Sequence, residues 1–399
     1  MKKLLLILLC LPMIGFGQGW VNTYNISFNG NNGNISNSVK ETTDGGYISF
    51  GTIIIKTDSV GDTIWTKPYW ANSGTQTIDG GYAFLGDGLI KTNSFGDTIW
   101  TKPLFGRSLR QVNDGGYVFL AEGPLTVIPD PDEQIYLNKT DSAGNLLWNK
   151  SYFPFSISGN SNAYNVEQTI DGGYIVFGSL NQNPILIKTD SNGDSIWTKS
   201  FTNIDRILNG IQTNDGGYIF TGFTNSNSIP IIKTDSLGNI IWQKFIQYSY
   251  EVAGGDIYQT TDNGYVIIGE QDINANYDLI EILLLRLDVN GDTIWTKSFG
   301  CPYGYGTSVQ ETSDGGFIMG GGCWQGINTS GQQYGEEIIL IKTNHLGTLT
   351  STTNLPINTS KGKLLKVTDI LGKETKGKKN EPLFYIYDDG TVEKRIVIE

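Results

Sequence analysis

Few residues of this chain have the type and spacing that chemistry requires. His345 is the one histidine in 399 residues, so a cluster of histidine metal ligands is excluded, and so is a Ser-His-Asp triad centred elsewhere. The segments Asp190–Asp194 and Asp288–Asp292 follow the pattern Asp-x-Asn-x-Asp, which resembles the first ligands of a calcium loop. The glycine that should come next and a later acidic ligand are both missing, and hairpin-turn chemistry explains the pattern better. The sequence therefore predicts no metal and no cofactor.

Carboxylates that could act as general acids or bases are spread along the connecting segments. No two of them stand at a spacing that marks out a catalytic pair, so the sequence predicts no catalytic residues. The available acids are Glu122, Asp130, Asp132, Glu133, Asp256, Glu270, Asp272, Glu336 and Glu337.

Aromatic residues are frequent in or beside the same connecting segments, with Asn and Gln nearby. Aromatic faces beside amides suit sugar rings or a protein partner. The alternative is that these rings cap the structure against solvent. The candidate ligand-binding residues are Tyr69, Trp70, Tyr248, Tyr250, Tyr303, Tyr305, Trp324 and Tyr334.

The elements that must position these residues come from a repeat. The motif Asp-Gly-Gly-Tyr, or a close variant, begins at seven positions: Asp44, Asp79, Asp114, Asp171, Asp215, Asp262 and Asp314. An apolar run and a turn, usually Thr-Asp-Ser-x-Gly, follow each copy, and six of the turns lead into a tryptophan. Self-similarity at this period means that each copy is one supersecondary unit.

Each unit reads as four short strands. In the copy around Asp171, the strand-forming segments are 165–170, 174–177, 185–189 and 195–199. Gly-rich and Asp-rich turns separate them, and no sustained helical period appears. Seven units of four antiparallel strands predict an all-β, seven-bladed β-propeller. The tryptophans recur at one position in each unit, which indicates packing between blades.

The chain ends predict how the ring closes. The seventh unit has Ser351 where the other units have tryptophan, so its fourth strand is missing. The segment Gly19–Asn22 contains Trp20 and precedes the first motif as Trp295 precedes the last. The N-terminal strand is therefore expected to complete the last blade and remove its open edge.

In this fold the Asp-Gly-Gly turn and the Asp-Ser-x-Gly turn lie on one face, which we call the short-turn face. The other two connections of each unit lie on the opposite face, which we call the variable-loop face because nearly all length variation falls there. Variable loops on a rigid scaffold usually carry binding, so a ligand is expected on this face. Cys301 and Cys323 also fall there, on adjacent strands of the last blade. A disulfide between them is expected, and two separate buried thiols are the alternative.

The first 17 residues read as a secretory signal peptide. Lys2 and Lys3 precede an apolar run, and small residues at Gly15 and Gly17 fit a cleavage site. No other segment is long and apolar enough to span a bilayer. The formal charge of the chain is -12, and the signal and residues 352–399 each contribute about +2, which leaves about -16 for residues 18–351. A surface this acidic repels phosphate backbones, so nucleic acid is not an expected partner.

The repeat stops after Ser351, and residues 352–362 read as a linker. Residues 363–399 then form a small β module with an Asp-Gly hairpin. Its segments Val367–Glu374, Phe384–Tyr387 and Lys394–Ile398 stand in the order seen in type A C-terminal sorting domains of the type IX secretion system, which the module closely resembles. The resemblance implies transport across the outer membrane by the type IX secretion machinery. The usual Pro-containing opening strand is largely missing.

The repeats of residues 18–351 resemble those of exported bacterial β-propeller proteins, a likeness that bears on fold and not on activity. The sequence therefore predicts a secreted or cell-surface, non-catalytic propeller, a binding or adhesion module that takes a glycan or a protein through the variable-loop face. The alternatives are an enzyme acting on extracellular polysaccharide and a scaffold without a specific ligand.

Overall fold

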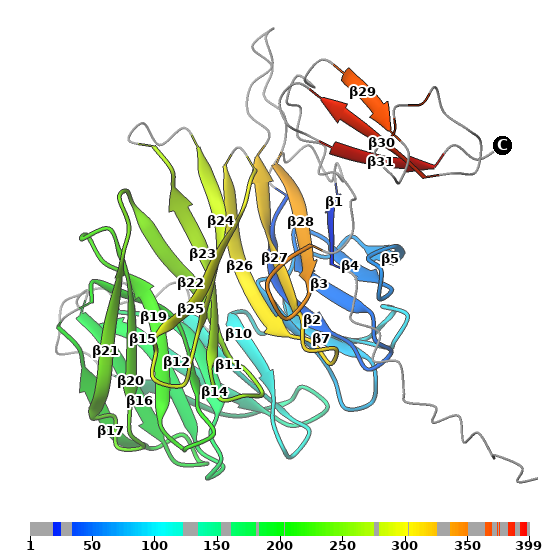
Figure 1. Cartoon of the computed structure of the whole chain (residues 1–399). Helices are drawn as coiled ribbons and strands as arrows, with labels where there is room; N and C mark the ends of the chain where they lie inside the picture. Colours follow the sequence, from blue (N-terminus) through cyan, green and yellow to red (C-terminus); the bar gives the residue numbers. More distant parts are fainter. Residues whose placement is uncertain are drawn as a thin grey trace, which may run out of the picture.

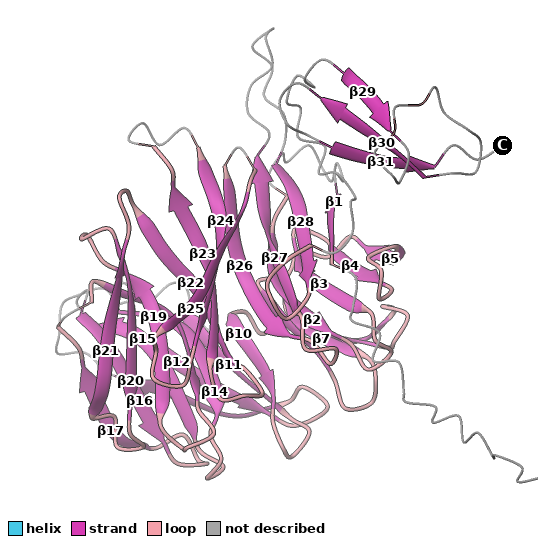
Figure 2. Cartoon of the chain, viewed as in Figure 1, coloured by secondary structure: helices cyan, strands magenta, loops and turns pink. Residues whose placement is uncertain are grey.

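The computed structural model describes residues 19–24, 34–122, 135–152, 161–180, 183–202, 204–274, 279–301, 303–324, 336–349, 364–368, 373, 375, 382–387 and 392–396. These residues contain strands β1 to β31 and no helix, as Figure 2 shows. In this part of the chain there is accordingly no helix that could cross a bilayer. The predicted signal peptide (residues 1–17) and linker (352–362) lie outside the described residues.

Strands β1 to β28 pair in seven sets of four, which we number as blades 1 to 7 along the chain (Figure 1). Blade 1 is β2 (Ser36–Glu41), β3 (Tyr47–Gly51), β4 (Ile54–Thr57) and β5 (Thr63–Lys67). Blade 2 is β6 (Ser73–Gln76), β7 (Tyr82–Leu85), β8 (Leu89–Thr92) and β9 (Thr98–Lys102). Blade 3 is β10 (Arg107–Gln111), β11 (Tyr117–Glu122), β12 (Ile135–Thr140) and β13 (Leu146–Tyr152). Blade 4 is β14 (Ser161–Gln168), β15 (Tyr174–Leu180), β16 (Asn183–Thr189) and β17 (Ser195–Ser200). Blade 5 is β18 (Arg206–Gln212), β19 (Tyr218–Phe223), β20 (Ser228–Thr234) and β21 (Ile240–Gln247). Blade 6 is β22 (Val252–Gln259), β23 (Tyr265–Asp272), β24 (Ile280–Leu287) and β25 (Thr293–Phe299). Blade 7 is β26 (Gly304–Glu311), β27 (Phe317–Trp324), β28 (Glu336–Thr343) and β1 (Trp20–Tyr24).

The first strand of every blade faces the centre of a closed ring. Strands β2, β6, β10, β14, β18, β22 and β26 contact one another in this order, and β26 contacts β2. Blades 5 and 6 are also joined by one bridge between Phe223 and Ala253. The all-β propeller prediction is confirmed, and the seven inner strands surround a central channel.

The middle strands of each blade are buried on both sides because neighbouring blades pack face to face. In blade 4, Tyr174–Phe177 is fully buried, whereas the outer strand β17 alternates between exposed and half-buried side chains. Burial on both sides explains why the middle strands are almost entirely apolar instead of alternating with polar residues.

An ion pair inside each blade explains the Asp-Gly-Gly motif. Asp171 accepts hydrogen bonds from Thr169 Oγ1 (2.5 Å), the N–H of Gly173 (3.0 Å) and Nζ of Lys188, which lies 2.9 Å from Oδ2. The Lys188 side chain is 5% exposed, and its Nζ also donates to the Thr189 carbonyl (2.7 Å). The equivalent pairs are Asp44–Lys56, Asp79–Lys91, Asp114–Lys139, Asp215–Lys233, Asp262–Arg286 and Asp314–Lys342.

The two glycines of the motif have different roles. Gly172 has a φ of 83°, which L-residues with a side chain rarely adopt. A Cβ on Gly173 would stand 2.1 Å from the Thr189 carbonyl oxygen and 2.7 Å from Lys188 Nζ. The first glycine therefore makes the turn, and the second leaves room for the buried ammonium.

Tryptophans of the outer strands join each blade to the next. The Trp148 ring packs edge-on against Tyr174 with centroids 5.8 Å apart, and a Cβ on Gly193 would stand 2.8 Å from it. The same edge-on contacts are made by Trp65–Tyr82, Trp100–Tyr117, Trp197–Tyr218, Trp242–Tyr265 and Trp295–Phe317. The predicted role of the tryptophans in packing between blades is confirmed.

The N-terminal strand closes the ring as predicted. Strand β1 pairs antiparallel with β28, with Trp20 opposite Lys342 and Tyr24 opposite Ile338. Trp20 then packs on Tyr47 of blade 1 at 5.7 Å, and its Nε1 donates to the Ser59 carbonyl at 3.2 Å. Blade 7 thus contacts blade 1 through the same residue type that joins the other blades.

A second set of contacts links the inner strands near the short-turn face. Gln168 Oε1 accepts the N–H of Asn113, the residue before the motif aspartate of the preceding blade, at 2.9 Å. Glu41 does the same for Ser313 across the closure, at 2.7 Å. The other five blades make the equivalent bond, in which a side-chain oxygen accepts the backbone N–H of the residue before the motif aspartate. The pairs are Gln76 with Thr43, Gln111 with Ile78, Gln212 with Ile170, Gln259 with Asn214 and Glu311 with Thr261.

The C-terminal residues form a sheet of their own. Strands β29 (Leu364–Thr368), β30 (Pro382–Tyr387) and β31 (Val392–Ile396) pair antiparallel in this order. The expected small β module is present, and its sorting role remains a prediction.

Replacing Trp20 with alanine tests the closure. We expect the Trp20→Ala variant to lose about 3 kcal/mol of unfolding free energy, because the ring contact with Tyr47 is removed at the joint between the chain ends. Thermal unfolding followed by circular dichroism measures this. The control is Trp70→Ala, at a tryptophan that is 45% exposed, where we expect little change. Equal melting temperatures for the two variants would contradict the role of Trp20.

The motif aspartates predict a loss of stability in acid. Partial burial alone would raise the pKa of Asp79, but hydrogen bonds from Thr77, Lys91 and the N–H of Gly81 outweigh it and lower the pKa to about 2. The pKa values of the other six motif aspartates are lowered by the same balance. A carboxyl whose folded pKa is depressed stabilises the fold above its unfolded pKa and loses that contribution as the pH falls.

We therefore expect the melting temperature to drop between about pH 4 and pH 2. Glu167, Asp256 and Glu270 act in the opposite direction, because burial raises their pKa values, but the seven motif aspartates outnumber them. Melting curves across this range test the expectation, with Asp171→Asn as a variant that should show a smaller drop. A melting temperature that stays constant down to pH 2 would disprove it.

Candidate functional site

The aromatic candidates Tyr69 and Trp70 lie between β5 and β6, on the variable-loop face. The Tyr69 ring packs against Phe84 at 5.4 Å, and its hydroxyl is 2.7 Å from Thr98 Oγ1. Trp70 next to it is 45% exposed. Tyr69 therefore contributes to packing between blades, and Trp70 presents its ring to solvent.

Three further candidates lie together in blade 7. Tyr303 packs against Trp324 with ring centroids 4.6 Å apart, and the N–H of Trp324 donates to the Tyr303 carbonyl at 3.2 Å. Tyr305 lies opposite Gly322 in the β26–β27 pairing, and a Cβ on Gly322 would stand 2.5 Å from the Tyr305 ring. These rings cover the end of the last blade beside the disulfide.

The remaining candidates are more dispersed. Tyr248 is half-buried, and burial raises its pKa while a hydrogen bond with Thr296 opposes the change. Tyr250 is exposed, and Tyr334 lies outside the described residues. None of the seven candidates that the structure describes lines the channel cavities or the cleft described below. A common binding site for them remains a prediction.

The predicted disulfide between Cys301 and Cys323 is confirmed. The Cα atoms are 5.9 Å apart, the sequence separation is 22 residues, and both side chains are buried in the core of blades 6 and 7. Closing a loop of this size stabilises the fold by roughly 3 kcal/mol in the chain-entropy model. The bond ties the start of β26 to the end of β27, on the variable-loop face.

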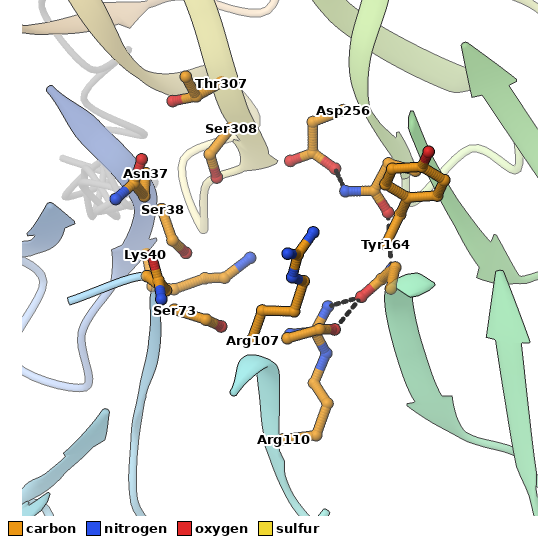
Figure 3. Close-up of a pocket in the computed structure, with 14 residues that line it drawn as sticks. Asn37, Ser38, Lys40, Ser73, Arg107, Arg110, Tyr164, Asp256, Thr307 and Ser308 are labelled. Atoms are coloured by element: carbon orange, nitrogen blue, oxygen red, sulfur yellow. Dashed lines mark hydrogen bonds between the residues drawn. The ribbon is translucent and has the colours of Figure 1, made fainter. Parts of the chain in front are cut away.

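The central channel is hollow in the described part of the structure. The residues six positions before the seven motif aspartates all line one cavity of about 440 Å³: Ser38, Ser73, Ser108, Asn165, Asn209, Asp256 and Ser308. Inner strands run from the variable-loop face to the Asp-Gly-Gly turn, so this cavity lies in the half of the channel toward the variable-loop face. Figure 3 shows these side chains and their neighbours converging on it.

Many of these side chains bind the backbone of the neighbouring inner strand. Ser108 Oγ accepts the N–H of Val166 at 2.9 Å, and Asp256 Oδ2 accepts the N–H of Val309 at 2.9 Å. Asn209 Nδ2 donates to Asp256 Oδ1 at 2.7 Å. Inner strands of adjacent blades do not continue one ladder, so their facing amides need such partners. Part of the polar lining is therefore structural.

Charged side chains also reach the channel from several blades. Arg110 Nη2 donates to Asn165 Oδ1 at 2.9 Å and lies 4.0 Å from Glu167 Oε1. Glu167 Oε2 accepts the N–H of Gln212 at 3.0 Å. Burial raises the pKa of both Glu167 and Asp256, and the positive charges of Arg110 and Lys40 oppose this. Burial lowers the pKa of Lys40, against the attraction of Asp256 and Glu167.

The residue four positions before the motif aspartate is different in every blade. Strand alternation places it on the same side of the inner strand as the residue six positions before. The seven residues are Lys40, Thr75, Arg110, Glu167, Ile211, Tyr258 and Gln310. All but Gln310 line a second cavity of about 280 Å³, further along the channel toward the short-turn face. Of the two channel-facing positions, this one thus differs most from blade to blade.

Asp256 is among the acids that the sequence offers, whereas the other charged channel residues, Lys40, Arg107, Arg110 and Glu167, are not among the predicted site residues. A usable signal was present, because a fixed distance from each motif aspartate carries a different residue type in each repeat. This variation points to a site once the first strand of each unit is known to face the central channel.

A separate cleft of about 410 Å³ lies between blades 5 and 6. Arg206, Glu251, Glu270 and Asp272 are among its lining residues. Burial raises the pKa of Glu270, and the charges of Glu251 and Asp272 add to the effect. Within the described ranges, no three His, Cys, Asp or Glu side chains are grouped so that they could hold a metal ion.

Solved structures with a similar fold are β-propellers. A structure of streptogramin B lyase is 12% identical with a TM-score of 0.52, over 82% of this chain and 99% of that one. A structure of YCF48 bound to a D1 peptide is 15% identical with a TM-score of 0.51, over 84% of this chain and 99% of that one. No protein-family model and no curated protein sequence matches the chain. At these identities the likeness is one of fold alone, and it agrees with the strand pairing: the chain folds as a β-propeller.

Proposed function

We propose that this protein is an exported, non-catalytic binding module whose ligand enters the central channel from the variable-loop face. The observation that carries the proposal is the variation of the residues that face the channel. Seven different residues occupy the position four before the motif aspartate. The ion-pair position, by contrast, is Lys in six blades and Arg in one.

A scaffold without a ligand would need only the packing residues. The ion pairs, the tryptophans and the Gln or Glu contacts repeat in every blade because each holds the strands of a blade together or joins it to its neighbour. The channel positions have no such uniformity, and their mixture of hydroxyl, amide and charged groups gives an asymmetric surface inside a symmetric ring. An asymmetric polar cavity of about 440 Å³ has the size of a small-molecule site.

Binding is favoured over catalysis by how the acids are held. Asp256 accepts three hydrogen bonds, from Asn209 Nδ2, the N–H of Ile257 and the N–H of Val309. Glu167 is engaged by the N–H of Gln212. A carboxylate tied down in this way is poorly placed to transfer a proton to a substrate. One neighbour in fold is named a lyase and another is named with a bound peptide, so an enzyme acting on extracellular polysaccharide and a peptide binder remain outcomes of the test.

Export and surface location are part of the proposal. They rest on the signal-like first 17 residues, on the resemblance of residues 363–399 to type IX sorting domains, and on the acidic balance of residues 18–351. The partners proposed are the secretion machinery for the C-terminal module and a glycan or protein ligand for the propeller.

Arrays of glycans and peptides, combined with analysis for released products, test the binding proposal. We expect binding without turnover, and we expect Ser38→Trp to abolish it, because an indole at this channel-lining position fills the cavity. The control is Ser195→Trp on the exposed side of outer strand β17. Melting temperatures of both variants show that the fold is kept. Binding that survives Ser38→Trp would place the ligand on the loops, and released fragments would establish an enzyme.

Deletion of residues 363–399 tests the sorting proposal in a host with a type IX system. We expect the truncated protein to fold and to accumulate in the periplasm, whereas the full chain reaches the cell surface. Fractionation with an antibody against the propeller gives the measurement. Surface delivery of the truncated chain at the normal level would refute the role of the C-terminal module.

A further inference from the structure

The half of the channel toward the variable-loop face gathers positive charge in an acidic protein. The chain has a formal charge of -12, yet Lys40, Arg107 and Arg110 line the same cavity, with Asp256 as its acidic residue. Glu167 lies further along the channel. A ring whose surface repels anions therefore has cations at its centre, and low-dielectric walls strengthen their field.

Hydrogen-bond partners separate the charged groups that are already satisfied from those that are available. Both oxygens of Asp256 have N–H donors, from Asn209, Ile257 and Val309. Arg110 donates to the Leu109 carbonyl and to Asn165. These two side chains hold the channel wall together and are poorly placed to bind anything else.

Lys40 is different. Its Nζ makes no hydrogen bond and no close ion pair with any residue of the described part of the chain, although it lies deep in the channel. Burial lowers its pKa, which is the effect of taking an ammonium group out of water. Figure 3 shows Lys40 and Arg107 both projecting into the cavity. Lys40 is half-buried, so its ammonium has three donors that the described residues do not use and that are open to an acceptor in the cavity.

Two serine hydroxyls add donors at the same place. Ser73 Oγ accepts the N–H of Leu109 at 3.0 Å, and Ser308 Oγ accepts the N–H of Val39 at 3.3 Å. A hydroxyl oxygen that accepts from the wall keeps its own proton to donate, and both serines line the cavity. The two hydroxyls therefore add donors beside the Lys40 ammonium.

We propose that this cavity binds a small anionic group, a carboxylate or another oxyanion, through Lys40, with Ser73 and Ser308 as further donors and with the positive charge of Arg107 lining the same cavity. Charge-assisted hydrogen bonds from an ammonium and from hydroxyls are the usual means of holding such a group. A cavity of about 440 Å³ takes an anion of monosaccharide size, for example a hexuronate. The inference rests on the channel being the ligand site, and it adds the chemical class of the ligand.

Calorimetric titration of the purified protein tests it with three probes: D-glucuronate, inorganic phosphate and, as the neutral match of glucuronate, D-glucose. We expect glucuronate to bind at least about tenfold more tightly than glucose, which corresponds to one charge-assisted hydrogen bond. Binding of phosphate alone would identify the source of the anion as a phosphate, and binding of both would identify a general oxyanion site.

Lys40→Met carries the decisive comparison. We expect this variant to lose at least about tenfold in anion affinity and to keep its melting temperature, because within the described residues the Lys40 ammonium makes no hydrogen bond or close ion pair that the substitution would remove. The control is Lys67→Met on the outer strand, where Nζ pairs with Asp97 at 2.7 Å, away from the channel. Equal affinity in Lys40→Met and the wild type, or no binding of glucuronate and phosphate, would overturn the inference. Array binding that is abolished by Ser38→Trp and unaffected by Lys40→Met would leave the channel function standing and reject the anion.

Discussion

The ion pair between each motif aspartate and a buried lysine or arginine is the interaction on which the rest of the structure depends. It joins the turn after the inner strand to the third strand of the same blade, for example Asp171 to Lys188. The carboxylate also binds the turn itself, through the N–H of Gly173, so one side chain sets both the turn and the strand register. A buried charge that loses its partner is strongly destabilising, so the pair specifies one arrangement of the four strands.

Contacts between blades repeat with the same regularity. The tryptophan of each outer strand packs on the next blade, and a Gln or Glu of each inner strand binds the turn of the preceding blade. Both kinds of contact occur across the closure, through Trp20 and Glu41. The ring is therefore held at its outer rim and at its inner rim by residue types that recur from blade to blade. Channel-facing side chains of the first strands also contribute, as Ser108 and Asp256 do by accepting the N–H groups of Val166 and Val309.

This distribution of structural contacts indicates where function can arise. Residues facing the channel are supported by neighbours on both sides, so their identity can differ from blade to blade without loss of the fold. The result is a cavity in which Ser73, Ser308 and Lys40 present donors while Asp256 and Asn165 hold the wall. The aromatic residues of the variable-loop face have a different character. Those that the structure describes contact the blades beneath them, as Tyr69 does with Phe84, or stand singly in solvent, as Trp70 does.

Local pattern in the sequence determined the repeat, the strand class, the closure by Trp20 and the pairing of Cys301 with Cys323. These follow from spacing along one chain, because turns, strand alternation and equivalent positions in a repeat are local properties. Tertiary structure alone decided that the motif aspartate meets a buried lysine 12 to 28 residues later. It also decided that Lys40, Arg107 and Asp256 share one cavity. Those residues come from blades 1, 3 and 6, and no local rule relates them, because their proximity depends on how far each blade is rotated about the axis of the ring.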